Sequence, residues 1–348
     1  MKKGFALVMA SMMALSLTAC GGNGSSATTA ADTSAADTKA EGTTAVAPAD
    51  KIGLAGSGKE LIFTTGGDQG TYYGFGSVLA GQISDMTDTT VTAIVGKGSK
   101  GNIEAMDAGD AQLGFVQSDV MAYAYNGTNL FDGAKVDGFS TVAALYMEQV
   151  QIVTLNPDIK TVADLKGKTV SVGDSGSGVY FNALDCLGAY GLTIDDITPT
   201  YQSFGDSVEA MQDGKIDAAF IVAGAPTTAV TSLAATRKVY LVELDDEHID
   251  KLIEASPYYS KYTIAKDAYG LDADATTVAV GAVVVARDDA DENDIYNVVA
   301  GIYDSIDTLG HDKKNELDLD FAASVTAVPY HKGAAKYFAE KGLTVPTK

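Results

Sequence analysis

The sequence predicts an α/β protein of two lobes with mostly parallel sheets, and three observations predict it. Short apolar, β-branched runs alternate with segments of helical periodicity. Gly-rich turns join several of these runs to the helix that follows. Two extended stretches, at 146–155 and 277–286, separate two sets of such units. Strands that alternate with helices of this length are typical of parallel α/β units.

The first set of units lies between residues 61 and 117. Short apolar runs bounded by turn residues predict strands at 61–65, 91–95 and 112–117. Helices are predicted at 72–83 and 102–108. In the first helix, Phe75, Leu79 and Ile83 have the spacing of one helical face.

The second set follows the first extended stretch. Its predicted strands are 169–173, 217–222 and 239–243, and its predicted helices are 179–190, 206–212 and 226–235. Pro226 falls in the first turn of the last of these helices, where its missing N–H costs nothing. A final amphipathic helix is predicted from Ile295, Val298, Val299, Ile302 and Ile306.

The two extended stretches predict that the chain crosses twice between the lobes. We therefore expect lobe 1 to comprise residues 59–152 and 278–348, and lobe 2 to comprise residues 153–277. The two crossings then form the hinge, and the last helices return to lobe 1.

The N-terminus predicts export. Residues 1–19 have a basic start, an apolar run too short for a membrane span, and a small-residue end, as in a secretory signal peptide. The run ends Leu17-Thr18-Ala19-Cys20-Gly21, which resembles the lipobox of bacterial lipoproteins. That resemblance implies an extracytoplasmic protein, lipid-anchored through Cys20 to the outer face of the bacterial cell membrane. The alternative is an ordinary signal peptide that happens to contain a cysteine.

The segment 20–58 is predicted to be a disordered tether after the lipidated cysteine. It consists almost entirely of Gly, Ala, Ser, Thr and Asp and contains no aromatic residue. Such a composition cannot bury enough apolar surface to offset the entropy of ordering the chain.

Composition excludes several classes of function. With 24 Lys+Arg against 46 Asp+Glu, the net charge is −22, so nucleic acid and anionic lipid surfaces repel the chain. Two cysteines and three histidines are too few for a zinc finger or a disulfide framework, and the histidines lack metal-ligand spacing. We therefore expect no metal and no cofactor.

Three Gly-rich turns, at 66–73, 96–102 and 173–179, join strands to helices. Each places backbone N–H groups at a helix N-terminus, where the helix dipole favours an anion. In open α/β sheets, ligands lie beyond the carboxyl ends of strands, where these turns lie. The turns can also be ordinary tight turns and N-caps. Because three share one construction, a shared anionic ligand is favoured.

Motifs of enzymes and nucleotide-binding proteins are weak or missing. The turn 96–101 fits G-x-G-x-x-G, but the pattern is short and an exported protein has no ready supply of NAD. The turn 173–179 lacks the Lys-Ser/Thr ending of a phosphate loop. The sequence has no G-x-S-x-G and no H-E-x-x-H. We therefore predict a protein that is not an enzyme.

Six short motifs occur in a fixed order over about residues 60–343. They are Gly70-Thr71-Tyr72-Tyr73; Gly98-Ser99 with Asn102; Gln117-Ser118-Asp119; Leu165-Lys166-Gly167-Lys168 with Gly176-Ser177-Gly178; Asp213–Ala218 with Gly224-Ala225-Pro226; and Pro329–Ala334. In this order they resemble the TAXI family, the solute receptors of TRAP transporters. Val179 departs from the family's usual threonine, and 266–270 is a loose version of its segment.

The resemblance implies a two-lobed periplasmic-binding-protein-like fold (type II) and a transport function. Such a receptor closes on a small organic anion, such as an acidic amino acid (for example glutamate), a keto acid or a dicarboxylate. It then delivers the ligand to the TRAP membrane permease subunits. Backbone and hydroxyl donors are expected to bind the anion, because Arg237 and Arg287 lie away from the turns in sequence.

The expected ligand-binding residues follow the Gly-rich turns and the family motifs. They are Thr71, Tyr72, Tyr73, Ser99, Asn102, Gln117, Ser177, Gly178, Val179 and Ala225. Two other classes stay open: a ligand-sensing lobe for a membrane signalling kinase, and a secreted enzyme with a cleft lined by tyrosine and serine.

Overall fold

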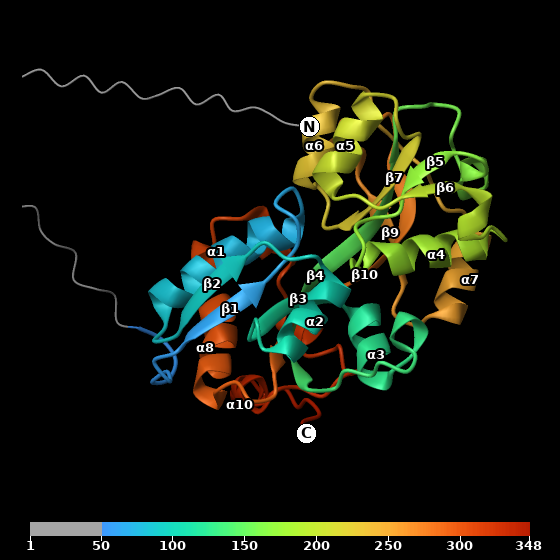
Figure 1. Cartoon of the computed structure of the whole chain (residues 1–348). Coiled ribbons are helices and arrows are strands. Elements are labelled where there is room, and N and C mark those ends of the chain that lie inside the picture. The colour runs from blue at the N-terminus through green and yellow to red at the C-terminus, as the bar shows by residue number, and fades with distance from the viewer. Residues whose placement is uncertain (1–50) are drawn as a thin grey trace, which may run out of the picture. The chain divides into compact units, whose positions relative to one another are not determined.

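Residues 51–348 are described by a computed structural model, in which a ten-stranded sheet carries helices on both faces (Figure 1). The strands are β1 (Glu60–Thr64), β2 (Thr90–Ile94), β3 (Leu113–Gln117), β4 (Phe139–Thr154), β5 (Thr169–Ser171), β6 (Thr198–Thr200), β7 (Ala218–Ala223), β8 (Tyr240–Leu241), β9 (Ser260–Ile264) and β10 (Ala275–Arg287). The helices are α1 (Thr71–Met86), α2 (Ser99–Ala108), α3 (Ser118–Asn126), α4 (Val179–Ala189), α5 (Phe204–Gln212), α6 (Thr228–Ala234), α7 (Asp246–Ala255), α8 (Glu292–Tyr303), α9 (Leu319–Ala322) and α10 (Lys332–Glu340).

Each strand and helix that the sequence predicts occurs, with ends shifted by a few residues. The sequence did not predict β6, β9, α3, α7, α9 and α10. Helix α3 begins directly after β3 without a turn residue. In α7, Ile249, Leu252 and Ile253 do have helical spacing, so the sequence contained a signal for this helix that the prediction did not use. The expectation for Pro226 was wrong: Thr227 is the extended N-cap of α6, so the proline precedes the helix.

The sheet is mixed, which corrects the expectation of mostly parallel sheets. Its strand order is β2-β1-β3-β10-β4-β7-β5-β6. Pairs at the two ends of this order, such as β1 with β2 and β5 with β6, are parallel. The central strands β4 and β10 pair antiparallel with each other. In addition, β10 pairs antiparallel with β3, and β4 pairs antiparallel with β7. The reason is the double crossing: the chain leaves the first lobe through β4 and returns through β10.

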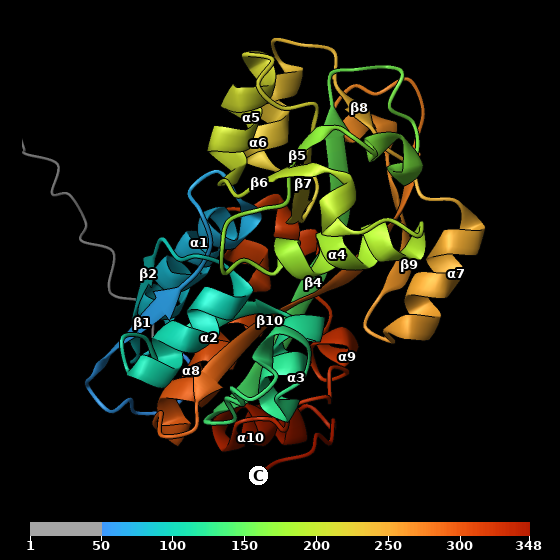
Figure 2. The same cartoon turned by 45° about the vertical axis from the view of Figure 1, so that its right-hand side comes forward.

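Two lobes share this sheet, and β4 and β10 run through both (Figures 1 and 2). The two crossing stretches predicted as the hinge lie within these strands. The cores of one lobe draw on segments 61–146 and 282–345, apart from Phe181. The cores of the other lobe draw on residues 150–280. The residue-level boundaries between the lobes stay a prediction.

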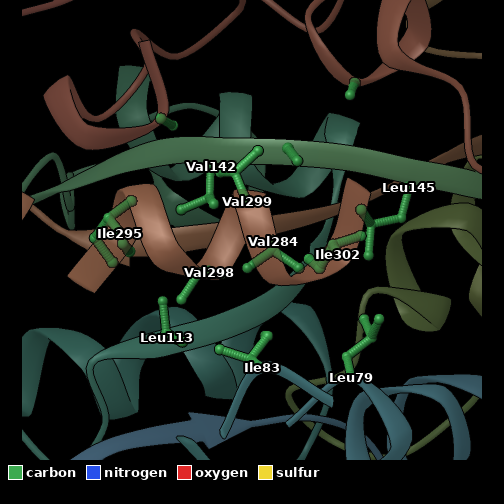
Figure 3. Packing of buried hydrophobic residues seen from close by; sticks show 14 of the residues in the cluster. Leu79, Ile83, Leu113, Val142, Leu145, Val284, Ile295, Val298, Val299 and Ile302 are labelled. Atoms are coloured by element: carbon green, nitrogen blue, oxygen red, sulfur yellow. The ribbon is translucent and has the colours of Figure 1, made fainter. Parts of the chain in front are cut away.

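Successive side chains of the long strands point to opposite faces of the sheet, so each strand contributes core residues on both faces. In β10, Ala282, Val284 and Ala286 pack toward α1 and α8, whereas Val283 and Val285 pack toward α2 and α3. This alternation is the period of two of a strand with helices on both faces. Figure 3 shows the first of these cores, where Ile295, Val298, Val299 and Ile302 of α8 lie among Leu79, Ile83, Leu113, Val142, Leu145 and Val284.

The folded part begins before Lys59, so the predicted end of the tether is wrong. Ile52 pairs with Thr87, and the Leu54 N–H donates to Asn297 Oδ1 at 2.6 Å. The Ser57 N–H donates to Asp294 Oδ1 at 3.1 Å. Residues 52–57 are therefore held by the end of α1 and by α8. The predicted signal peptide (1–19), Cys20 and most of the tether lie outside the described residues. Within residues 51–348, every helix is too short or too polar to span a bilayer.

Candidate functional site

A cavity of about 80 Å³ lies between the two lobes. Its walls come from the turns before α1, α2, α4 and α5, and from the middle of the sheet. The lining residues are Gly66–Tyr72, Gly96–Ser99, Gln117, Glu148, Asp174, Ser177–Val179, Gln202–Gly205, Val222 and Ala223. A cavity of this size suits a small molecule rather than a peptide.

The N-termini of α1, α2, α4 and α5 meet at this cavity. Their N-cap residues are Gly70, Gly98, Gly178 and Ser203, and all four line it. The three glycines carry no side chain that caps the helix, so first-turn N–H groups are left without an intrahelical partner. Together with the helix dipoles, these N–H groups favour an anion.

Three buried polar atoms of the cavity lining have no hydrogen-bond partner within the described residues. They are the Tyr72 hydroxyl, Gln117 Oε1 and Ser177 Oγ. Their side chains belong to residues that are only 8%, 2% and 7% exposed. Buried polar atoms are nearly always paired in folded proteins, so these atoms indicate a ligand or ordered water in the cavity.

Ser99 adds a free donor to the same wall. Its Oγ accepts the Gln117 N–H at 3.0 Å, which leaves its own proton to donate. Thr71 lines the cavity as well, but its hydroxyl is used: Oγ1 donates to the Gly224 carbonyl of the other lobe at 2.8 Å.

Glu148 contributes a buried carboxyl to the floor of the cavity. It lies in the middle of β4 and is 2% exposed. Burial raises its pKa to about 8, against the opposing effects of the Tyr72 hydroxyl and the Lys313 ammonium. At neutral pH Glu148 is therefore mostly a protonated acid, which can donate a hydrogen bond to an anion.

Charged residues line the cavity beside these groups. Lys97 is exposed and makes no ion pair with any other described residue, whereas Asp68 and Asp174 contribute negative charge. The neutral Glu148 adds none at neutral pH. The cavity therefore offers N–H and hydroxyl donors more than side-chain cations.

The two lobes are closed over the cavity. The Gly101 N–H donates to the Gly176 carbonyl at 2.9 Å, and the Ala229 N–H donates to the Gln69 carbonyl at 3.2 Å. Both bonds join a helix N-terminus of one lobe to a loop of the other. A Cβ on Gly178 would lie 1.7 Å from Gln117 Oε1, so only glycine allows this approach.

The structure brings together seven of the ten residues that the sequence pointed to. Thr71, Tyr72, Ser99, Gln117, Ser177, Gly178 and Val179 line the cavity. Their binding of a ligand stays a prediction. Tyr73, Asn102 and Ala225 are not in the lining.

The three exceptions have structural explanations. Asn102 is fully buried, and its amide bonds Thr65 O and Phe115 O while its Oδ1 accepts from Thr64, so it ties α2 to the sheet. Tyr73 follows Tyr72 on α1 and therefore points to a different side of the helix. The Ala225 backbone is used within the protein, because its N–H donates to Gln149 and its carbonyl accepts from Lys313.

Sequence reasoning missed Glu148 and the turn before α5. The sequence could have pointed to Glu148 as a site residue, since it is the lone charged residue within the extended run of β4. The sequence could also have pointed to Ser203, because a serine three residues before Asp206 predicts a helix N-terminus. Phe204 carried no signal, because its place in the cavity depends on how the lobes meet.

By fold, this chain has the two-lobed architecture of periplasmic binding proteins. The chain belongs to the NMT1-like family, whose model matches residues 63–342. A protein of Escherichia coli (strain K12) that is named for binding aliphatic sulfonates is 43% identical over 70 residues. That match covers 20% of this chain and 22% of the relative, well under two thirds of its length.

Solved structures share the fold at low identity. MatC from Rhodopseudomonas palustris with bound malate is 14% identical, with a TM-score of 0.51 over 74% of this chain and 86% of that chain. The alkanesulfonate-binding protein SsuA from Xanthomonas axonopodis pv. citri bound to MOPS is 17% identical. Its TM-score is 0.48, over 82% of this chain and 85% of that chain. At these identities the likeness concerns the fold alone.

Proposed function

We propose that this protein is an extracytoplasmic receptor that captures a small organic anion between its lobes and delivers it to a membrane permease. The observation that carries the proposal is the meeting of four helix N-termini and three unpartnered buried polar atoms at one closed interlobe cavity. Family and structural neighbours are binding proteins rather than enzymes, which supports the same reading.

The ligand is proposed to be a carboxylate or a sulfonate. Both groups present several acceptor oxygens, which suit backbone N–H groups and the hydroxyls of Tyr72, Ser99 and Ser177. The protonated Glu148 donates one more hydrogen bond and adds no repulsive charge at neutral pH. Acidic amino acids, keto acids and dicarboxylates follow from the motif resemblance. The similarity to the protein of Escherichia coli that is named for binding aliphatic sulfonates favours a sulfonate.

The type of permease has two candidates. The order of the six motifs favours a TRAP permease of the TAXI type. The NMT1-like family and its sulfonate-binding relative favour an importer of the ABC type. Uptake into proteoliposomes distinguishes them, because a sodium gradient drives the first and ATP drives the second.

Membrane attachment through a lipid on Cys20 is part of the proposal. Mass spectrometry of the mature N-terminus tests it directly, since lipidation adds a diacylglyceryl group to the cysteine. A Cys20→Ala variant should be released from the membrane fraction. A mature protein with an unmodified cysteine would contradict the anchor but not the binding function.

The binding proposal is tested by thermal unfolding of the chain from Lys51 with a panel of ligands. The panel contains L-glutamate, 2-oxoglutarate, L-malate, succinate, ethanesulfonate, phosphate and a neutral sugar. A ligand at 100 times its Kd adds about 2.7 kcal/mol to the free energy of unfolding, a rise in Tm of about 4 °C for a chain of this length. We expect one acid class to raise Tm and the sugar to have no effect.

The matched control uses two buried serines. Ser99→Ala removes a cavity donor, and Ser207→Ala removes a buried hydroxyl that bonds only to Ser171 and Ser203 within one lobe. We expect loss of the ligand-induced shift in the first variant alone. If no anion shifts Tm after unfolding and refolding have removed any co-purified ligand, the proposal is wrong.

A further inference from the structure

A buried polar network lies behind the cavity, where α4 of one lobe meets β3 and α3 of the other. Its centre is Asn182. Asn182 Oδ1 accepts from Gln117 Nε2 at 2.9 Å, and Asn182 Nδ2 donates to Asp119 Oδ2 at 3.0 Å. Gln117 and Asp119 belong to the first lobe, whereas Asn182 belongs to the second.

The second lobe holds Asn182 in this orientation. Asn182 Nδ2 also donates to the Tyr259 hydroxyl at 2.7 Å, and that hydroxyl donates to Asp185 Oδ2 at 2.8 Å. Both amide protons of Asn182 thus face acceptors, and its oxygen faces a donor. An inverted amide would place its NH₂ against the Gln117 NH₂, so the chemistry fixes one orientation.

An apolar contact stands beside the network. Phe181, the neighbour of Asn182, is 1% exposed and packs into the core formed by α2 and α3. Its ring lies 5.8 Å from that of Tyr123 and 6.2 Å from that of Phe131. The start of α4 is therefore inserted into the opposite lobe by one aromatic ring and one amide.

Gln117 connects this network to the cavity. Its Nε2 is bound to Asn182, while its Oε1 is unpartnered and lies against Gly178 in the cavity lining. A ligand donor at Oε1 therefore fixes the same side chain that Asn182 holds. We propose that Asn182 is an interlobe latch, a positioning residue that stabilises the closed arrangement and links it to the ligand through Gln117.

The latch rests on the proposed function only for its link to the ligand. Two backbone amides report closure without any ligand. Gly101 N–H and Ala229 N–H lie in the first turns of α2 and α6, where no intrahelical acceptor is available, and each bonds only across the lobes. Their hydrogen exchange is slow only while the lobes are closed.

The experiment measures amide exchange by NMR in the chain from Lys51, with Asn182→Ala and a matched Asn297→Ala. Asn297 is also a fully buried asparagine, but its amide bonds only Leu54 and Thr89, far from the cavity. We expect Asn182→Ala to speed exchange at Gly101 and Ala229 at least tenfold. The Asn102 amide, which bonds within α2 to Gly98, should be unaffected. In Asn297→Ala, exchange at Gly101 and Ala229 should stay at the wild-type rate.

Tyr259→Phe is the second variant, because it keeps the ring and removes only the hydroxyl that orients Asn182. We expect faster exchange at the same two amides, by a smaller factor than in Asn182→Ala. Unchanged exchange at Gly101 and Ala229 in both variants would overturn the latch, as would a uniform increase at every amide.

The link to the ligand is measured with L-glutamate, L-malate and ethanesulfonate as probes. A probe that slows exchange at Gly101 in the wild type should slow it much less in Asn182→Ala. If none of the probes changes exchange while the Asn182→Ala effect remains, the latch stands and the choice of ligand class fails.

Discussion

Gly178 of one lobe lies directly against Gln117 of the other, so that a Cβ on Gly178 would come within 1.7 Å of Gln117 Oε1. The same Cβ would lie 2.7 Å from Ser99 Oγ. Gly178 has an ordinary right-handed φ of −68°, so the requirement for glycine here comes from contact between lobes and not from backbone strain. Closure of the cavity therefore depends on a missing side chain.

Gly178→Ala should block closure and leave folding intact. We expect the affinity for the ligand to fall at least a hundredfold by calorimetry, because the methyl group holds the lobes apart. The protein should still fold, with a free energy of unfolding lowered by about 1–3 kcal/mol, because the contacts of Phe181 and Asn182 across the lobes are lost.

Gly188→Ala is the matched control for that prediction. Gly188 lies on the same helix, and a Cβ there would meet open space. It should keep full affinity and gain a little stability, because alanine is the better helix former. Equal affinities in the two variants would mean that the ligand binds without this closure.

Tyr72→Phe should separate stability from binding. The Tyr72 hydroxyl is buried without a partner, and an unsatisfied buried polar group costs about 1–3 kcal/mol. Removal of the hydroxyl is therefore expected to keep or raise the Tm of the ligand-free protein, while the affinity for the anion falls about tenfold. A lower Tm with unchanged affinity would show that the hydroxyl has a structural partner instead.

Glu148 should make stability fall as pH rises. Its pKa is about 8 in the folded protein and about 4.5 in an unfolded chain, so the unfolded chain loses this proton first. The protonated Glu148 makes its full contribution to the free energy of unfolding below pH 4.5. This contribution is lost as pH rises to about 8, and the free energy of unfolding falls by up to about 1.4 kcal/mol per pH unit.

Chemical denaturation of the wild type and of Glu148→Gln checks this prediction. The carboxyl is faced by the Tyr72 and Tyr146 hydroxyls, and it is influenced by Asp119 and Lys313. Burial raises the pKa of Asp119 to about 7, so some pH dependence of the same sign should persist in the variant. We expect a flatter profile for Glu148→Gln between about pH 5 and about pH 8. Parallel profiles would mean that Glu148 stays exposed to water.

Residues 51–58 should contribute to stability. Asp294 is 1% exposed and accepts from the Ser57 N–H at 3.1 Å and from Thr89 Oγ1 at 2.7 Å. A chain that starts at Lys59 loses the bonds from Leu54 and Ser57, and each hydrogen bond to a buried carboxylate contributes about 1.5–3 kcal/mol. We expect a fall of about 2 kcal/mol relative to a chain that starts at Lys51, measured by urea unfolding. Equal stabilities would place these contacts outside the folded unit.

The sequence predicted those parts of the fold that depend on local pattern. Alternating strands and helices, the two crossing stretches and the Gly-rich turns before α1, α2 and α4 all follow from periodicity and turn chemistry. It did not predict α7, although Ile249, Leu252 and Ile253 have helical spacing. It also missed the antiparallel pairing of β4 and β10, because strand direction depends on which segments meet and not on their composition.

The sequence by itself determined where first-turn N–H groups are exposed, because N–H groups at a helix N-terminus belong to one turn of chain. Only the tertiary structure decided which residues face the cavity. Asn102 belongs to a motif that resembles TAXI receptors, yet it bonds to the sheet. Glu148 lies in an apolar strand and reaches the cavity floor. Gln117 and Asn182 are 65 residues apart and meet only because two lobes close. Contacts of that kind depend on the packing of whole lobes, which no local pattern records.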